Sequence, residues 1–254
     1  MHTVSSTPAA EVAFSRARRQ GPSCSIVEAV ERKTGDAWGR ALLDHCEQRE
    51  VVQPTLEVDG GDVGPALHPE WFFRPFDAWD WWERELLSEV RDGPVLDLGC
   101  GAGRAALHFQ ELGLEVTAVD NSPGAVEVCR RRGVVDSRVG DLNEPPDDRV
   151  WGAVLLLCGN LGLGGSWSRN RALLRKLAQL TSPAAVLVGD SVNFDGDADL
   201  RLRIGYREMV TPWWHQRNVK AVEIPALVAG TGWRVDRQLE DGVDHAVLLR
   251  RADT

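Results

Sequence analysis

Apolar residues in the middle and second half of the chain come in short runs, and stretches with helical periodicity separate these runs. Aliphatic runs with few charges are typical of strands that are covered on both faces of a sheet. Such strands are expected at residues 95–98, 115–119, 134–139, 150–157 and 184–189. Helices are expected at residues 104–112, 123–132, 166–180 and 225–229, before a final antiparallel pair at 232–239 and 244–250. This alternation predicts an α/β fold.

The N-terminal third of the chain predicts a different arrangement. Residues 1–25 show no sustained apolar period and are expected to form a flexible leader, and residues 26–90 are expected to form a helical cap. Apolar positions at helical spacing predict an amphipathic helix over residues 36–52, with Asp36 as its N-cap. Residues 53–69, rich in Gly, Pro and Asp, predict a connecting loop. The aromatic segment that follows predicts a second helix, with Trp79, Trp82, Leu86 and Leu87 on one stripe.

The strongest chemical signal is the turn D-L-G-C-G-A-G, which follows the first strand and leads directly into a helix. Gly99, Gly101 and Gly103 allow the backbone to bend tightly and to approach a bound molecule closely. A dinucleotide fingerprint G-x-G-x-x-G that starts at Gly99 would have its third glycine at position 104, which is Arg104. The spacing therefore argues against a dinucleotide site.

Acidic residues stand at the ends of the first three strands. Asp97 lies near the end of the first strand, Asp120 ends the second, and Asp141 follows the third. Asp120 comes about 20 residues after the glycine turn, where a carboxylate can accept hydrogen bonds from both hydroxyls of a ribose. Because the carboxyl ends of parallel strands meet at one edge of a sheet, the pattern predicts a ligand that contains adenosine.

The D-x-G-x-G-x-G turn, with the later acidic residues in order, resembles the class I S-adenosylmethionine (SAM)-dependent methyltransferases over residues 90–250. The resemblance implies a Rossmann-like, seven-stranded, mostly parallel sheet with helices on both faces. It implies a SAM-binding domain over residues 91–254, with a substrate insert at about 191–220. It also implies SAM as the cofactor, held by Asp97, Gly99, Cys100, Gly101, Gly103, Asp120, Asn121, Asp141, Leu142 and Cys158.

By the same resemblance, the methyl acceptor lies near the loop after the fourth strand, C-G-N-L-G-L-G-G, and near the insert. Asn160 and Tyr206 are candidates for catalytic contacts, and His215 is a candidate general base or substrate anchor. For His215, a structural role in a hydrogen bond is an open alternative. Substrate contacts are expected from Phe73, Phe76, Asn160, Trp213 and Trp214. For Phe73 and Phe76, packing of the N-terminal helices onto the sheet is the favoured alternative.

Composition narrows the function further. A net charge of −9 argues against a nucleic acid as the main partner. The five cysteines form no C-x-x-C pair, so neither a zinc site nor a disulfide framework is expected. The acidic stretch at residues 193–199 lacks the closing glutamate of a calcium loop and is expected to be a turn, so no metal is predicted. The longest apolar run is too short to span a bilayer, and a cytoplasmic monomer or homodimer is expected.

The expected activity is methyl transfer from SAM to an O, N or C nucleophile of a small molecule or peptide. The segments G-N-L-G-L, T-P-W-W-H-Q-R-N and A-G-T-G-W-R-V resemble bacterial methyltransferases of secondary metabolism. One alternative is a SAM-binding partner or regulatory subunit without catalysis. Another is a nucleotide-dependent oxidoreductase, against which Arg104 argues.

Overall fold

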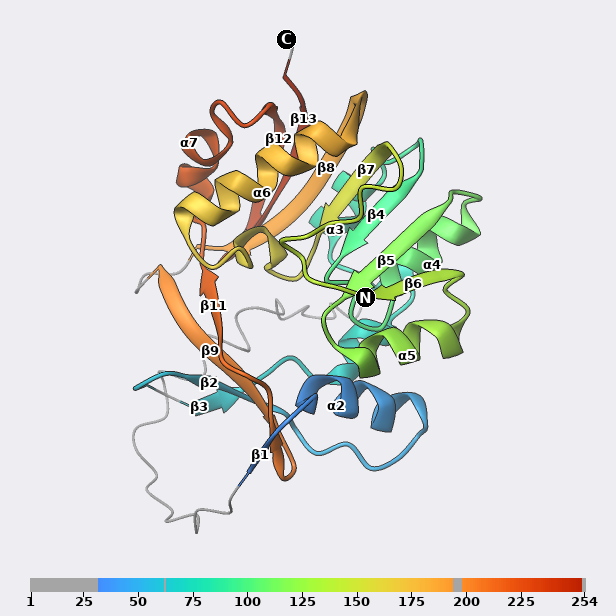
Figure 1. The fold of residues 1–254 in the computed structure, drawn as a ribbon, viewed down its shortest axis with the longest axis vertical. Helices are drawn as coiled ribbons and strands as arrows, with labels where there is room; N and C mark the ends of the chain where they lie inside the picture. Colours follow the sequence, from blue (N-terminus) through green and yellow to red (C-terminus); the bar gives the residue numbers. More distant parts are fainter. Residues whose placement is uncertain (1–31, 62, 194–197, 253–254) are drawn as a thin grey trace, which may run out of the picture.

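The computed structural model describes residues 32–61, 63–193 and 198–252. The expected leader at residues 1–25 and most of the acidic stretch at 193–199 lie outside the described residues. The chain forms two sheets, and the larger one stands above the smaller one in Figure 1. Within the described ranges, no helix is both long enough and apolar enough to cross a membrane.

The larger sheet has seven strands in the order β12-β13-β8-β7-β4-β5-β6. Its strands are β4 (Val95–Leu98), β5 (Val116–Asp120), β6 (Asp136–Val139), β7 (Trp151–Leu156), β8 (Thr181–Val192), β12 (Trp233–Asp241) and β13 (Asp244–Arg251). Strands β8, β7, β4, β5 and β6 pair in parallel, whereas β13 pairs antiparallel with both β8 and β12. Because one strand of the seven is reversed, the expected mostly parallel sheet is confirmed.

Helices cover both faces of this sheet, as predicted (Figure 1). One face carries α3 (Trp81–Leu87) and α4 (Arg104–Glu111). The other carries α6 (Trp167–Leu180) and α7 (Ile224–Val228). The remaining helices are α2 (Ala37–Cys46) and α5 (Pro123–Arg132), and short 3-10 turns occupy Pro69–Phe73, Phe76–Ala78, Asn160–Gly162 and Ala221–Glu223.

The central strand β4 is buried over its whole length. Val95 belongs to the core beneath α3 and α4, whereas Leu96 and Leu98 belong to the core beneath α6 and α7. Successive side chains of a strand point to opposite faces, so Asp97 points to the same face as Val95. The alternation therefore sends the one carboxylate of this strand toward α3 and α4.

The smaller sheet joins the N-terminal segment to the insert that follows β8. Its order is β1-β10-β9-β2-β3, and β11 also pairs with β9. Its strands are β1 (Lys33–Thr34), β2 (Thr55–Val58), β3 (Val63–Pro65), β9 (Asp199–Tyr206), β10 (Met209–Val210) and β11 (Trp214–Arg217). The insert and the N-terminal segment are thus parts of one structure.

Two predictions for the N-terminal segment are wrong. The expected loop at residues 53–69 contains β2 and β3, and β2 is stabilised by pairing with β9, where Leu56 lies opposite Ile204. This partner is far away in the sequence, so local composition gives no sign of the strand. The expected helix at 36–52 ends at Cys46, because the backbone turns into the left-handed region at Gln48, with φ of 56°.

Asp36 connects the smaller part of the fold to the larger one. Its carboxylate accepts a hydrogen bond from Gly39 N at 2.9 Å and so caps α2, which confirms the predicted N-cap. It also accepts hydrogen bonds from Ser122 Oγ at 2.8 Å and Gly124 N at 2.7 Å, at the start of α5. A Cβ atom on Gly124 would lie 2.7 Å from Gly39 Cα, so the close approach of the two helices requires glycine there.

Replacing this carboxylate tests the connection. We expect Asp36→Ala to lower the free energy of unfolding by about 2–4 kcal/mol, because one helix cap is lost and buried donors of α5 lose their acceptor. The fall in Tm, by about 5–15 °C, is measured by calorimetry. Asp92→Ala, in an exposed loop, is the matched control and is expected to change Tm little. Equal stability of the two variants would contradict this role of Asp36.

Candidate active site

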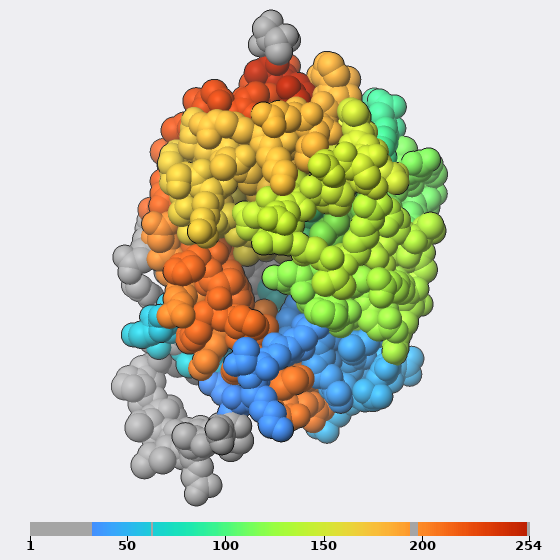
Figure 2. Space-filling model, viewed as in Figure 1, coloured from blue at the N-terminus to red at the C-terminus, as the bar shows by residue number. Residues whose placement is uncertain are grey.

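A cavity of about 930 Å³ lies between the carboxyl edge of the larger sheet and the smaller sheet. Its opening is visible in Figure 2 between the orange strands of the insert, the blue N-terminal segment and the yellow-green loops. The wall is formed by the glycine turn after β4, the ends of β5 and β8, the loops after β6 and β7, and parts of β9, β11, α2 and α3. The volume is near the upper end of the range for ligand sites, roughly 300–1,000 Å³, so two small molecules can share it.

The glycine turn forms part of this wall as the sequence predicts. Gly99 and Gly101 line the cavity, and both have positive φ, 76° and 54°. A Cβ atom on Gly99 would lie 2.1 Å from Asn160 Nδ2, so no larger residue fits there. Two expected cofactor residues of the same turn lie outside the wall: Gly103 forms the N-cap of α4, and the Cys100 thiol is buried beside Cys129.

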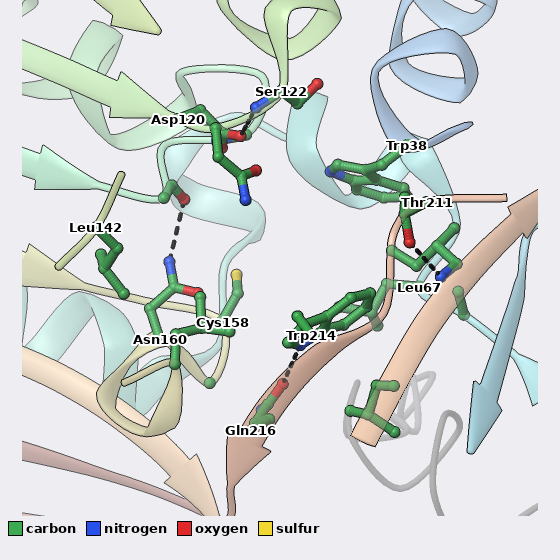
Figure 3. A pocket seen from close by; sticks show the side chains of 18 of the residues that line it. Trp38, Leu67, Asp120, Ser122, Leu142, Cys158, Asn160, Thr211, Trp214 and Gln216 are labelled. Carbon is green, nitrogen blue, oxygen red and sulfur yellow. Dashed lines mark hydrogen bonds between the residues drawn. The ribbon is translucent and has the colours of Figure 1, made fainter. Parts of the chain in front are cut away.

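Asp120, at the end of β5, lies in the cavity wall with both carboxylate oxygens in use (Figure 3). Oδ2 accepts a hydrogen bond from Gly101 N and Oδ1 accepts one from Ser122 N, each at 2.9 Å. Burial raises the pKa of this carboxyl to about 6, although these backbone donors oppose the rise. Each oxygen of a carboxylate has a second lone pair, so Asp120 can still accept hydrogen bonds from a ligand.

Three further residues that the sequence assigns to the cofactor line the same half of the cavity. Asn121 follows Asp120 directly, and Asp141 and Leu142 come from the loop after β6. Asp141 Oδ1 accepts a hydrogen bond from Asn143 N at 2.9 Å, which orders this loop. The structure therefore brings the carboxylates after β5 and β6 to one edge, as expected.

Asp97 is 2% exposed and is not part of the cavity wall. Within the described part of the chain, its Oδ2 atom has no hydrogen-bond partner. Burial raises the pKa of this carboxyl to about 7, while Arg104 opposes the rise and Asp120 adds to it. A backbone hydrogen bond from Ala106 also lowers this pKa, and an ionised carboxylate with an unpaired oxygen is costly to bury, so a cationic group beside Asp97 would be stabilised.

Glu83 and Arg104 both line the cavity and form a buried ion pair. Glu83, in α3, is 2% exposed, and Arg104, at the start of α4, is 7% exposed. Arg104 donates to both oxygens of Glu83 and to Cys158 Sγ, at 3.4 Å, and its guanidinium lies 4.3 Å from the centre of the Trp79 ring. The residue that replaces the third glycine of a dinucleotide fingerprint is thus a buried cation.

Asp190, at the end of β8, holds the loop after β7. Its carboxylate accepts hydrogen bonds from Cys158 N at 2.8 Å and from Gly159 N. Burial raises the pKa of Asp190 to about 7, and Glu83 adds to the rise. The Cys158 thiol faces the cavity (Figure 3) while protein encloses its other sides, and this enclosure raises its pKa to about 12. The thiol is therefore protonated at neutral pH and is not a thiolate nucleophile.

Asn160, in the loop after β7, and the residues of β11 line neighbouring parts of the cavity (Figure 3). Asn160 Nδ2 donates to Leu98 O at 2.9 Å and to Gly99 O at 3.2 Å, so its amide holds the glycine turn. Trp213, Trp214 and His215 line the cavity wall, as the sequence predicts for substrate contacts. Asn160 is positioned to order the turn, and His215 is exposed at the cavity.

Tyr206 is a predicted catalytic residue that the structure places elsewhere. Its ring is 2% exposed and packs with Ala37 and Ala41 between α2 and the smaller sheet. Its hydroxyl donates to Asp44 Oδ2 at 3.1 Å, and it is not part of the cavity wall. The prediction is wrong because Tyr206, the last residue of β9, packs under α2 and donates its hydroxyl to Asp44, whereas Leu202 and Ile204 of the same strand line the cavity.

Phe73 and Phe76 are also wrongly predicted as substrate contacts. Phe73 packs against the His45 ring, with centroids 4.5 Å apart, and Phe76 stacks on His108 at 3.8 Å. Phe72 lines the cavity instead. Neighbouring residues of a tight 3-10 turn point in different directions, so only one of these adjacent rings can face a given ligand.

The comparisons with known proteins agree with this geometry. Residues 95–184 match the family described as a methyltransferase domain. The chain is similar to a SAM-dependent methyltransferase from Bacteroides fragilis, solved with S-adenosyl-L-homocysteine (SAH), with TM-score 0.76 and 24% identity, covering 88% of this chain and 96% of that one. It is similar to the sugar N-methyltransferase KedS8 from Streptoalloteichus sp., with TM-score 0.52 and 17% identity, over 72% and 92% of the two chains.

A third similar structure is the methyltransferase CcbJ from Streptomyces caelestis, with TM-score 0.53 and 15% identity, over 70% of this chain and 95% of that one. The search of curated proteins gave no match. The resemblance drawn from the sequence is confirmed, and the chain has the fold of the class I SAM-dependent methyltransferases. In the described parts of the chain, no group of three or more His, Cys, Asp or Glu residues is arranged to hold a metal ion.

Sequence reasoning missed the polar residues that face the cavity from buried elements. Glu83 shares a helical stripe with Trp79, Leu86 and Leu87, and a charge on an apolar stripe is a sign of a buried ion pair. Asp190 follows the apolar run 184–189 as Asp120 follows the run 115–119, and this placement in the sequence could have marked it as a site residue. Asn218, which is also buried in the wall, gave no signal in the sequence.

The raised pKa of Asp97 predicts a dependence of stability on pH. Between pH 4 and pH 7 the folded state keeps a proton that the unfolded chain releases, so stability falls as the pH rises through this window. We therefore expect Asp97→Asn to be about 1–4 kcal/mol more stable than the wild type at pH 8 without ligand, and similar to it at pH 4. Thermal unfolding at both pH values measures this, with Asp92→Asn as the exposed control. A stabilisation that is the same at pH 4 and pH 8 would contradict the raised pKa.

Proposed function

We propose that this chain is a SAM-dependent methyltransferase. The observation that carries the proposal is the cavity edge where the glycine turn meets the buried Asp120 and the exposed Asp141, with the buried Asp97 just before the turn in β4. These groups fit SAM, which carries ribose hydroxyls, an adenine amino group and a cationic ammonium group. The unpartnered Oδ2 atom of Asp97 is the strongest sign of fit, because it requires a donor that the described part of the chain does not supply.

Each part of the wall has a role in holding the cofactor. Asp120 accepts hydrogen bonds from the ribose hydroxyls, and Asp141 with Leu142 holds the adenine. Gly99 and Gly101 allow the backbone to approach the cofactor, and Asp97 receives its positive amino end. When bound, SAM supplies a methyl group that its sulfonium already activates.

The remaining task of the protein is to hold the acceptor in line and to exclude water. The facing wall, with Trp38, Leu67 and Trp214 (Figure 3), provides an apolar surface for this. The acceptor is proposed to be an O, N or C nucleophile of a small molecule or peptide of bacterial secondary metabolism. The similarity to KedS8, a sugar N-methyltransferase, supports a small-molecule acceptor.

We further propose that residues 91–254 form the methyltransferase domain, with residues 26–90 as its cap and a substrate insert at about 191–220. The pairing of β2 with β9 supports this division of roles, because it joins cap and insert into one wall opposite the cofactor half. The cap thus contributes to the acceptor side of the cavity.

Calorimetric titration with SAM and SAH tests the cofactor. We expect micromolar binding by the wild type and a loss of at least tenfold, about 1.4 kcal/mol, for both Asp120→Ala and Asp97→Asn. Asp92→Ala, outside the cavity, is the matched control and is expected to bind as the wild type does. No binding of either compound by the wild type would refute the proposal.

Activity separates an enzyme from a SAM-binding subunit without catalysis. We expect release of SAH from SAM when a panel of amines, alcohols and phenols is offered, and loss of this release in Asp120→Ala. Binding of SAM without SAH release on any acceptor would favour the regulatory alternative.

A further inference from the structure

Asn218, which follows β11, carries a buried amide that the proposed cofactor site does not use. The residue is 2% exposed and lines the cavity. Within the described ranges, neither Oδ1 nor Nδ2 of its side chain has a hydrogen-bond partner. A buried donor or acceptor without a partner lowers the stability of the fold by roughly 1–3 kcal/mol. Two such atoms on one side chain in a cavity wall therefore point to a ligand that bonds to them.

Backbone contacts hold Asn218 in the half of the cavity opposite the proposed nucleoside site. Its neighbour Val219 donates from N to Ser191 Oγ at 3.1 Å, and Val219 O lies 2.7 Å from His245 Nε2. Ser191 is in β8 and His245 in β13, so Asn218 lies at the ends of these two strands. In the sheet order, β8 and β13 lie on one side of β4 whereas β5 and β6 lie on the other.

The same half of the cavity contains a carboxylate suited to an amine. Asp190 is 5% exposed, lines the cavity, and accepts its hydrogen bonds from the backbone of Cys158 and Gly159. Among the ion pairs of the described residues, none includes Asp190, and the nearby Arg104 is paired with Glu83. An ammonium or amine group placed here would therefore lie beside a carboxylate that accepts hydrogen bonds from backbone donors and forms no ion pair among the described residues.

The chemistry of Asn218 selects a second group on the same molecule. A carboxamide side chain offers one acceptor and two donors in one plane. A carboxamide on the ligand returns a donor and an acceptor in the complementary arrangement, which satisfies both atoms at once. A carboxylate, an ether or a ketone lacks a donor and would leave Oδ1 without a partner.

We propose that the methyl acceptor is an amine that carries a carboxamide group, with Asp190 receiving the amine and Asn218 pairing with the amide. This inference rests on the proposed methyltransferase function and names its substrate class. Methylation forms an N–C bond while the S–C bond of SAM breaks and its electron pair stays on sulfur. The proton that the nitrogen loses passes to the Asp190 carboxylate. Trp213 and Trp214, in the facing wall, provide an apolar surface for the body of the acceptor.

The test uses three matched probes with the full chain saturated with SAH. Phenylalaninamide has both groups, 2-phenylethylamine lacks the amide, and N-acetylphenylalaninamide lacks the free amine. We expect calorimetry to show phenylalaninamide binding at least tenfold more tightly than either of the other two. With SAM in place of SAH, mass spectrometry is expected to show a gain of one methyl group on phenylalaninamide.

Two variants of one residue assign the amide preference to Asn218. Asn218→Leu removes both polar atoms at similar volume, and Asn218→Asp keeps the acceptor oxygen but loses the donor. Both are expected to lose the tenfold preference for phenylalaninamide and to keep the wild-type affinity for SAH. Asn218→Leu is also expected to have a Tm equal to or above that of the wild type, because it removes an unsatisfied buried amide.

The outcomes separate this inference from the proposed function. If SAH does not bind the wild type, the methyltransferase proposal itself fails. If SAH binds but phenylalaninamide does not bind or has no advantage over 2-phenylethylamine, the acceptor class is wrong and the methyltransferase proposal stands. A preference that survives in Asn218→Leu would remove Asn218 from the acceptor site.

Discussion

The contact between the starts of α2 and α5, which Asp36 makes possible, sets the geometry of the whole molecule. One carboxylate caps α2 through Gly39 N and also accepts hydrogen bonds from Ser122 Oγ and Gly124 N at the start of α5. Because α5 follows β5, whose last residue is Asp120, this contact fixes the N-terminal segment directly beside the proposed ribose site. The segment then pairs with the insert through β2 and β9. The junction therefore joins the two parts of the fold whose residues line the cavity.

Buried carboxylates explain what that cavity is prepared to bind. Asp97, Asp120 and Asp190 all have a raised pKa with burial as the largest cause, and they come from three strand ends along one edge of the sheet. Without a ligand, ionising these groups costs stability, because burial outweighs the backbone hydrogen bonds that they accept. A ligand that brings positive charge and hydrogen-bond donors reverses this cost. The buried carboxylates therefore lower the stability of the free protein and raise its affinity for a cation such as SAM.

The sequence predicted the larger sheet well because its information is local. The central strands β4, β5 and β7 are largely aliphatic runs, and the caps Ser122 and Ser166, with the glycine turn, mark where helices begin. The smaller sheet depends on pairing between residues about 150 positions apart, such as Leu56 with Ile204, which no local pattern contains. The site residues likewise divide into those that local sequence predicts and those that depend on distant contacts. Asp120 and Asp141 were predictable from their positions after strands, whereas the orientation of Tyr206 and Phe73 depends on packing against distant elements.

Arg104 links the two halves of the site and shows why one substitution in a common motif matters. A glycine at this position would allow α4 to pack closely against the sheet, as in dinucleotide sites. Arginine instead places a cation under the wall, where Glu83 neutralises it and Cys158 Sγ lies 3.4 Å away. Asp190 accepts a hydrogen bond from Cys158 N. Arg104 and Asp190 therefore both hold Cys158, in the loop between the proposed cofactor and acceptor groups. Because Arg104 is paired with Glu83, it leaves Asp190 without a cation of its own. The positive charge of Arg104 nevertheless opposes the rise in the pKa of Asp190, so the residue that argues against a dinucleotide favours the ionised form of this carboxylate.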